Sequence, residues 1–428
     1  MTEDTLKDGL EPKETSIQNN RPEGVITVVL TADNHLGYAA FGQNPHKREE
    51  HQQRLRRAFQ QATDFAIAQG VDLFIQAGDL FDTATPGERD RSFVAARLAQ
   101  LKQAGIRTFA LGGVHDTPTD TQLHLGEESS PAPLISYARL GALHYFPPIQ
   151  KNEALELEAV MQTIRGIRVG ICGLSVLPGL EGEPLARLHV QNEIEGATVP
   201  ILILHAPIEG LKVKEGLNLA KLPAFRYILA GYHHSYSRLR VGQSEIIVAG
   251  ATQHVDFSAP DHDPGFVFLG LAADGVRWCN HISVDALALR RLTIHTNELW
   301  PADPSTPQPQ PTEIILERLR PLCDAETMIQ LRLEGELTRS QYHQLDLNQI
   351  RRYGEEHCFA LAIDDSALSL LPEQEAISGE KGERFSPREE LIALADEWIA
   401  AADEQEKKAL QITKEELLLA MDEIKGKR

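Results

Sequence analysis

Histidine and aspartate side chains recur at the ends of apolar segments in the first half of the chain. The first three such segments end in DNH at residues 33–35, GDLFD at residues 78–82 and GGVHD at residues 112–116. Two later segments end in His205 and in GYHH at residues 231–234. Carboxylate and imidazole groups together suit Mn²⁺, Fe²⁺ or Zn²⁺. If these segments are neighbouring strands, their ends meet at one edge of a sheet, and the sequence predicts a metal centre there.

The elements that would position these side chains follow a strand–helix order. Buried strands are expected near residues 25–30, 71–77 and 106–111, and helices at residues 48–70 and 88–105, each ending at a glycine. This order predicts a mainly parallel sheet with helices on its faces. Further strands with little helix between them are expected at residues 167–174, 199–207, 225–234, 244–252 and 265–275. Together they predict a mixed α/β sandwich of two sheets.

Composition excludes several classes of protein. The chain has 428 residues, of which 42% are hydrophobic, so two or three domains with a sizeable core are expected. We find no apolar stretch of about 18 residues and no signal peptide, and therefore expect no membrane span. Four cysteines without CxxC spacing indicate reduced thiols and a cytoplasmic protein. The net charge of -20 disfavours a protein that coats nucleic acid non-specifically, but it permits an enzyme with local basic patches.

The composition changes at both ends of the chain. Residues 1–24 are polar and are expected to be a disordered tail. A Pro-rich linker is expected at residues 301–312, a small α+β domain at 313–372, and a second linker at 373–386. Charged helices are expected at 387–428, and their apolar stripes fit either a partner-binding surface or packing against each other.

The ordered set of motifs resembles the calcineurin-like metallophosphoesterases, whose pattern is DxH, GDxxD, GNHD, H and GHxH. The segments GDLFDTATP, VAGATQHVDFS and DPGFVFLGL are similar to those of SbcD-type nuclease subunits of double-strand-break repair complexes. Thr83, where the Ser/Thr phosphatases carry arginine, disfavours that branch. The resemblance implies an α/β sandwich of two mixed sheets flanked by helices, with nuclease activity at residues 25–300 and a capping domain at 313–372. It also implies a homodimer that binds DNA, and a helical segment that binds an SbcC-type ABC/SMC-like ATPase.

The resemblance also implies a set of metal ligands. Carried over residue by residue, the family's ligands fall on Asp33, His35, Asp79, His205 and His234. The first metal would be held by Asp33, His35 and His234. Asp79 would bridge to a second metal, which His205 would also bind. Mn²⁺ is the expected ion, at one or two per chain, with Mg²⁺, Fe²⁺ and Zn²⁺ as alternatives.

The loop at residues 112–116 would carry the remaining chemistry. By the same resemblance, His115 would lie over the leaving group and protonate the departing sugar oxygen, and Asp116 would orient it. Arg238 and Arg240 follow the GYHH motif and are expected near the site, where they could contact DNA phosphates.

Two family ligands of the second metal are replaced in this chain. Val114 stands in place of the GNHD asparagine, and Tyr232 in place of the first GHxH histidine. Valine offers no donor atom, and a tyrosine oxygen has a different reach from an imidazole. His233 could substitute if the loop shifts by one residue.

Three interpretations of these replacements remain open. In the first, the second metal binds weakly and nuclease activity survives at a reduced level. In the second, the chain is a catalytically impaired DNA-binding scaffold of the same complex. A phosphodiesterase acting on small substrates is the third. The losses fall on one metal site only, which favours a retained site of altered metal stoichiometry.

Overall fold

The computed structural model describes residues 22–39, 44–118, 132–147, 155–175, 188–190, 192–211, 216–222, 225–257, 263–300 and 310–371, and the single residues 395, 399, 407, 410, 411, 413 and 414. The chain divides into two units, Met1–Leu371 and Pro372–Arg428. Most of the predicted N-terminal tail, most of the Pro-rich linker, the second linker and nearly all of the predicted C-terminal helices lie outside the described residues.

A six-stranded mixed sheet carries the first three predicted motif segments. Its order is β14-β13-β1-β2-β3-β4, and β1 to β4 run parallel while β13 and β14 are antiparallel to their neighbours. The strands are β1 (Val25–Thr31), β2 (Leu73–Ala77), β3 (Arg107–Leu111), β4 (His144–Phe146), β13 (Gly265–Ala272) and β14 (Gly275–Ser283). The predicted strand–helix alternation and parallel pairing are confirmed.

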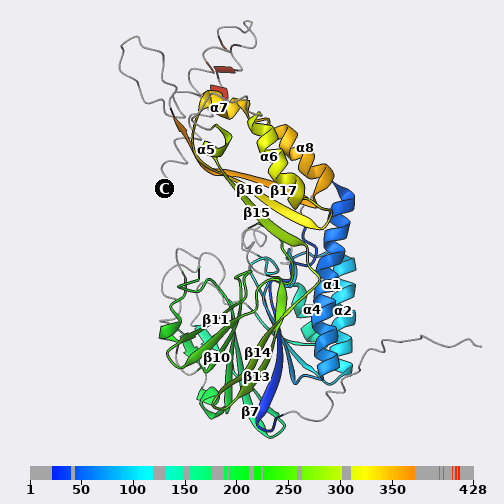
Figure 1. The fold of residues 1–428 in the computed structure, drawn as a ribbon. Helices are drawn as coiled ribbons and strands as arrows, with labels where there is room; N and C mark the ends of the chain where they lie inside the picture. Colours follow the sequence, from blue (N-terminus) through cyan, green and yellow to red (C-terminus); the bar gives the residue numbers. More distant parts are fainter. Residues whose placement is uncertain are drawn as a thin grey trace, which may run out of the picture. The chain divides into compact units, whose positions relative to one another are not determined.

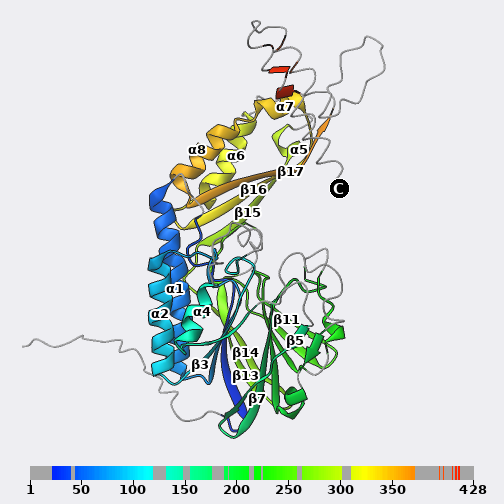
Figure 2. The ribbon, with the colours of Figure 1, turned by 180° about the vertical axis from the view of Figure 1, so that it is seen from behind.

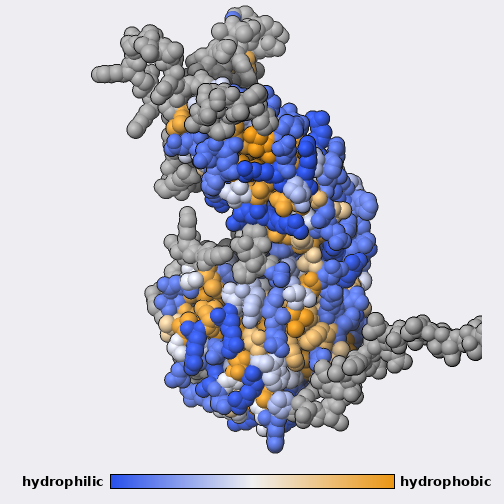
Figure 3. Space-filling model, in the orientation of Figure 1, coloured by the Kyte–Doolittle hydropathy of each residue, from blue (hydrophilic) through white to orange (hydrophobic). Residues whose placement is uncertain are grey.

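Helices cover one face of this sheet. They are α1 (Pro45–Gln69), α2 (Glu88–Gln103) and α4 (Pro133–Arg139). Asn44 caps α1 by accepting hydrogen bonds from two backbone N–H groups, and Gly70 ends it at a φ of 55°. Figure 1 shows α1 and α2 running along this sheet, and their buried apolar side chains form one cluster with those of the sheet. Their outward surface is mostly hydrophilic (Figure 3), so these apolar faces are buried by the chain's own sheet.

A second six-stranded sheet packs face to face with the first (Figure 2). Its order is β11-β12-β10-β9-β7-β6, with antiparallel strands at both edges. The strands are β6 (Val160–Ile164), β7 (Ile167–Ser175), β9 (Val199–His205), β10 (Tyr227–Gly231), β11 (Ser237–Val241) and β12 (Ser244–Val248). Short strands β5 (Leu155–Leu157) and β8 (Leu188–Val190) pair separately. The 3-10 helices η2 (Asn192–Gly196) and η3 (Leu219–Lys221) contribute to the outer face of this sheet.

A three-stranded parallel sheet follows in the chain. It consists of β15 (Ala288–His295), β16 (Thr327–Thr338) and β17 (Ala360–Leu371). The accompanying helices are α5 (Thr296–Leu299), α6 (Pro311–Leu319), η4 (Arg320–Leu322), α7 (Arg339–Gln344) and α8 (Leu347–His357). Since β15 precedes residue 300, the sheet of the predicted capping domain begins before the predicted boundary. Helices α7 and α8 are separate, because Asp346 caps α8 by accepting a hydrogen bond from the Gln349 N–H.

The cysteines differ from the sequence expectation. Cys323 and Cys358 form a disulfide across a sequence separation of 35, while Cys172 and Cys279 are free. The fold brings the turn after α6 next to the end of α8, a proximity that spacing along the chain does not reveal. None of the helices in the described part of the chain is both long and apolar enough to cross a membrane.

Phe74 tests the packing of the helices on the first sheet. Its ring is fully buried and meets Phe59 of α1 edge to face, with ring centroids 6.1 Å apart. Phe74→Ala should lower the free energy of unfolding by about 3–5 kcal/mol, because it removes a large side chain and leaves a cavity. Urea titration measures this, with Leu140→Ala as the control: Leu140 is 76% exposed, so its truncation should change stability by less than about 0.5 kcal/mol. Equal effects of the two substitutions would contradict the packing.

Candidate metal centre

Backbone hydrogen bonds tie the loop after β1 to the loop after β2. The N–H groups of Asp33 and His35 donate to the carbonyl oxygens of Gly78 and Asp79, at 3.0 and 3.1 Å. Asp33, His35 and Asp79 adopt left-handed φ values of 47°, 45° and 53°. Such values are uncommon for residues other than glycine and concentrate at functional sites. The two loops therefore hold three polar side chains at the carboxyl ends of adjacent strands.

Two glycines allow other elements to approach these loops closely. A Cβ atom at Gly78 would lie 2.1 Å from Nδ1 of His205, and one at Gly113 would lie 2.1 Å from Oδ1 of Asp79. Any side chain at either position would displace a candidate ligand. The glycines of the GDxxD and GGVHD segments therefore allow β9 and the loop after β3 to complete the site.

Two buried histidines each have Nδ1 held by a neighbouring oxygen atom. Nδ1 of His35 lies 3.2 Å from Oδ1 of Asp82, and Nδ1 of His205 lies 2.8 Å from the carbonyl oxygen of Ala77. Nε2 of both histidines is buried and points into the cluster, where Nε2 of His205 lies 3.3 Å from Oδ2 of Asp79. Metal-binding histidines are oriented in this way, with the second nitrogen bonded to a carboxylate or carbonyl. The two Nε2 atoms are therefore suited to bind a metal.

His234 and Asp33 complete this pattern. Nδ1 of His234 lies 3.6 Å from Oδ2 of Asp256, which is an ion-pair distance. Oδ1 of Asp33 accepts a hydrogen bond from the backbone N–H of Tyr232, at 3.1 Å. Oδ2 of Asp33 is buried and makes no hydrogen bond. An unpartnered buried carboxylate oxygen beside two imidazoles fits a bound cation.

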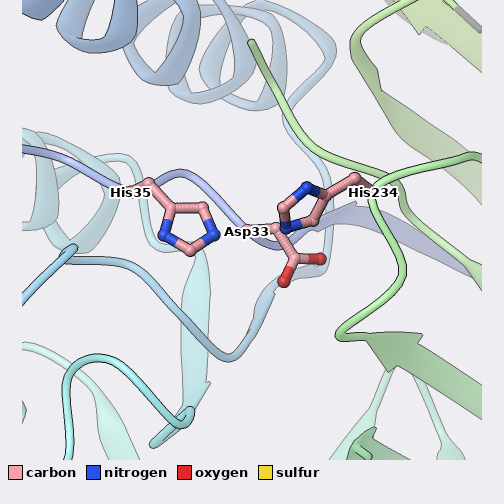
Figure 4. Close-up of side chains that lie close together, drawn as sticks. All are labelled: Asp33, His35 and His234. Atoms are coloured by element: carbon pink, nitrogen blue, oxygen red, sulfur yellow. The ribbon is translucent and has the colours of Figure 1, made fainter. Parts of the chain in front are cut away.

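Potential ligand atoms in the described residues gather into three groups, each within 4.8 Å: Asp33, His35 and His234; Asp33, Asp79 and His205; and His35, Asp79 and His115. The first group is the predicted first metal site, and Figure 4 shows its three side chains close together. The second group contains both predicted protein ligands of the second metal. Asp33 belongs to both of these groups, whereas the resemblance assigned the bridging position to Asp79.

The buried charges of the centre favour a cation. Burial raises the pKa of Asp79, but the charges of His205 and His35 outweigh burial and hold this pKa below its usual range. Burial lowers the pKa of His205, yet Asp79, whose Oδ2 lies 3.3 Å from Nε2, raises it to about 9. A proton on the His205 ring thus supplies positive charge beside the buried carboxylates. A metal ion would supply this charge in place of the proton on binding.

His115 is held near the centre by two aspartates. Its backbone N–H donates to Oδ1 of Asp79 at 2.8 Å, and its Nδ1 lies 3.7 Å from Oδ1 of Asp82. The same oxygen of Asp82 contacts His35. Asp82 was not among the predicted site residues, although its place in the GDxxD motif was a signal. Asp82 therefore links a candidate ligand to the candidate general acid.

Asp116 has a different position from the one that the resemblance implied. It is fully buried, and its carboxylate accepts hydrogen bonds from the backbone N–H groups of Gly113 and Leu80, at 2.7 and 2.9 Å. Burial, together with the charge of Asp79, raises the pKa of Asp116 to about 6. Asp116 thus fixes the loop that carries His115, while Asp82 is the carboxylate that faces the His115 ring.

The replaced ligand positions lie at the edge of the second group. Val114 is half-buried, and the ring of Tyr232 lies 5.7 Å from that of His205. Nε2 of His233, the predicted substitute, accepts a hydrogen bond from the backbone N–H of Ile208 at 3.0 Å. Burial and the nearby His234 lower the pKa of His233 to about 4. In this arrangement His233 is turned away from metal binding through Nε2.

The two arginines proposed to contact DNA lie on β11. Arg238 donates to Oε2 of Glu245 at 3.2 Å, and Arg240 is exposed and pairs in register with Glu245. One carboxylate therefore offsets part of their positive charge.

Comparisons with known proteins agree with this geometry. The family model "Calcineurin-like phosphoesterase" matches residues 26–231. The DNA double-strand break repair protein Mre11 of Methanosarcina mazei is 26% identical over 257 residues, which cover 59% of this chain and 37% of that protein. Mre11 of Thermoplasma acidophilum is 28% identical over 52% of this chain and 55% of its own length. Mre11 of Halobacterium salinarum is 24% identical, covering 72% and 71%. The matched region thus spans less than two thirds of the first two relatives.

Asp82→Asn tests whether this carboxylate orients the centre. Loss of its charge beside His35 should weaken Mn²⁺ binding by about 10- to 100-fold, the usual cost of removing a group that orients a metal ligand. Isothermal titration calorimetry measures the affinity. Asp274→Asn is the matched control, because Asp274 is exposed between β13 and β14 and pairs with Arg277. Equal Mn²⁺ affinities for the two variants would contradict the assigned role of Asp82.

Proposed function

We propose that this chain, whose residues 26–231 match the calcineurin-like phosphoesterase family, is a metal-dependent nuclease that hydrolyses phosphodiester bonds in DNA. The observation that supports this most directly is the convergence of buried carboxylate and imidazole groups from Asp33, His35 and His205 at one edge of the paired sheets. The similarity to Mre11 relatives, which are named as double-strand break repair proteins, supports DNA as the substrate.

The metal ligands of this proposal follow the groups of donor atoms. Asp33, His35 and His234 would hold one ion, and Asp79 and His205 would bind a second one together with Asp33. Mn²⁺ suits this set of carboxylates and imidazoles. Bound there, divalent ions would act as Lewis acids toward water and the phosphoryl oxygens.

The remaining chemistry is assigned to the chain's own residues. His115 is half-exposed beside the centre, where it can protonate the departing sugar oxygen. Asp82 faces Nδ1 of His115 and would stabilise the protonated ring. The hydrogen bond from the His115 N–H to Asp79 holds the backbone of His115 beside a candidate ligand.

A second candidate function is favoured by Val114 and Tyr232. Because both stand where the family has metal ligands, the second ion has fewer protein donors, and the chain could serve as a DNA-binding scaffold without cleavage. The buried group of Asp33, Asp79 and His205 favours retained activity, since all three side chains stay in place.

The partners and compartment of the protein belong to the same proposal. We expect the nuclease subunit of an SbcCD-like complex, a homodimer that binds an SbcC-type ATPase through residues 387–428 and acts on DNA in the cytoplasm. The disulfide between Cys323 and Cys358 is atypical for that compartment, so the oxidation state of the purified protein bears directly on this assignment.

Metal content and cleavage of labelled duplex DNA, measured together in Mn²⁺, test the function. The wild type should bind metal and cut DNA, and His115→Ala should lose cleavage by about 100-fold or more while keeping its metal, because it removes the general acid. The double variant Val114→Asn/Tyr232→His should bind the second ion more tightly.

Two outcomes would contradict DNA cleavage by this metal centre. If the wild type binds DNA but does not cut it at any Mn²⁺ concentration, and the double variant does cut, the chain is a scaffold that has lost its second site. If wild type and His115→Ala cut equally, the cleavage does not arise from this centre.

A further inference from the structure

Tyr232 stands where the family pattern has a metal-binding histidine, and its backbone is held in an uncommon conformation. Its φ is 80°, a left-handed value that is costly for a bulky side chain. The hydrogen bond from its N–H to Oδ1 of Asp33, at 3.1 Å, maintains this conformation. The direction of the Tyr232 side chain is therefore fixed by a candidate metal ligand.

The phenol ring of Tyr232 is presented at the edge of the centre. Tyr232 is 37% exposed, whereas His205 beside it is fully buried. The ring meets His205 and His233 at steep interplanar angles of 73° and 74°, with centroids 5.7 and 5.4 Å away. Two imidazoles thus support an aromatic ring that remains accessible beside the candidate ligand His205.

An exposed aromatic ring next to a phosphodiester-cleaving centre suits stacking better than metal binding. The phenol oxygen lies farther from Cα than either nitrogen of an imidazole, so the substitution moves the only donor atom away from the ligand position. Every nucleobase has a flat face, and aromatic side chains bind unpaired bases by stacking on that face.

We propose that Tyr232 is a substrate-binding residue whose ring stacks on an unpaired nucleobase beside the scissile phosphate. The proposal rests on the proposed nuclease function and deepens it. It assigns the centre a substrate with at least one unstacked nucleotide, as found in single strands and frayed ends. The position that holds a metal-binding histidine in the family pattern would then hold a DNA-binding tyrosine in this chain.

The test compares two single-stranded oligonucleotides that differ only in the bases around one phosphate. One strand, the based strand, carries a nucleobase at every position, and the other carries abasic sites on both sides of that phosphate. The full chain is assayed in Mn²⁺ for KM, kcat and metal content, and its Kd for each strand is measured by fluorescence anisotropy. The variants are Tyr232→Ala, Tyr232→Phe and, as a control for loss of an exposed apolar side chain outside the motifs, Leu140→Ala.

Tyr232→Ala should raise KM and Kd for the based strand by about 10-fold, the effect of losing one stacked base. Its kcat and metal content should stay within about twofold of the wild type. Tyr232→Phe keeps the ring and should match the wild type, as should Leu140→Ala. On the abasic strand, wild type and Tyr232→Ala should be equal.

Two results would overturn the proposal. One is an unchanged Kd and KM for the based strand in Tyr232→Ala. The other is a loss of bound Mn²⁺ in Tyr232→Phe, which would make the phenol oxygen a ligand. The binding measurement keeps the two proposals apart: a base-dependent Kd without any cleavage would support the role of Tyr232 while contradicting the nuclease function.

Discussion

The candidate centre depends on the backbone hydrogen bonds that join the loops after β1 and β2. The N–H groups of Asp33 and His35 donate across to the second loop, and three candidate ligands take left-handed conformations as a result. Each such conformation costs about 1–3 kcal/mol, which the pairing of the loops must offset. Without the hydrogen bonds to the other loop, each loop would lose contacts that offset the cost of these conformations. The ligand atoms of the two strands are therefore set by one shared constraint.

A second layer of contacts orients the donors that this constraint positions. Asp82 contacts both His35 and His115, so one carboxylate serves a candidate ligand and the candidate general acid. Asp116 is buried beneath the loop and holds its backbone. The candidate ligands and the candidate general acid are thereby linked through side chains that do not themselves belong to the ligand set.

The sequence predicted the main features because they follow from periodicity. Apolar strand segments alternating with helices predicted the parallel sheet, and the polar motifs at their ends predicted a metal centre at its edge. The grouping of Asp33, His35 and His234 was implied by the family resemblance. The direction of each side chain was not predictable, because it depends on loop conformation. Asp82 and Asp116 are both aspartates in glycine-containing loops, and only the left-handed turns determine which one faces His115. Pairings distant in sequence, such as Cys323 with Cys358 and β15 with β16, leave no local pattern either.

The intact group of Asp33, His35 and His234 carries the central claim, which is that this edge of the sheets is a metal centre despite the replaced positions. Anomalous diffraction at the manganese absorption edge, from crystals of the full chain grown with Mn²⁺, tests it most directly. The account predicts an anomalous peak bonded to Oδ2 of Asp33 and to Nε2 of His35 and His234. A structure at saturating Mn²⁺ with no peak between these three side chains would contradict it.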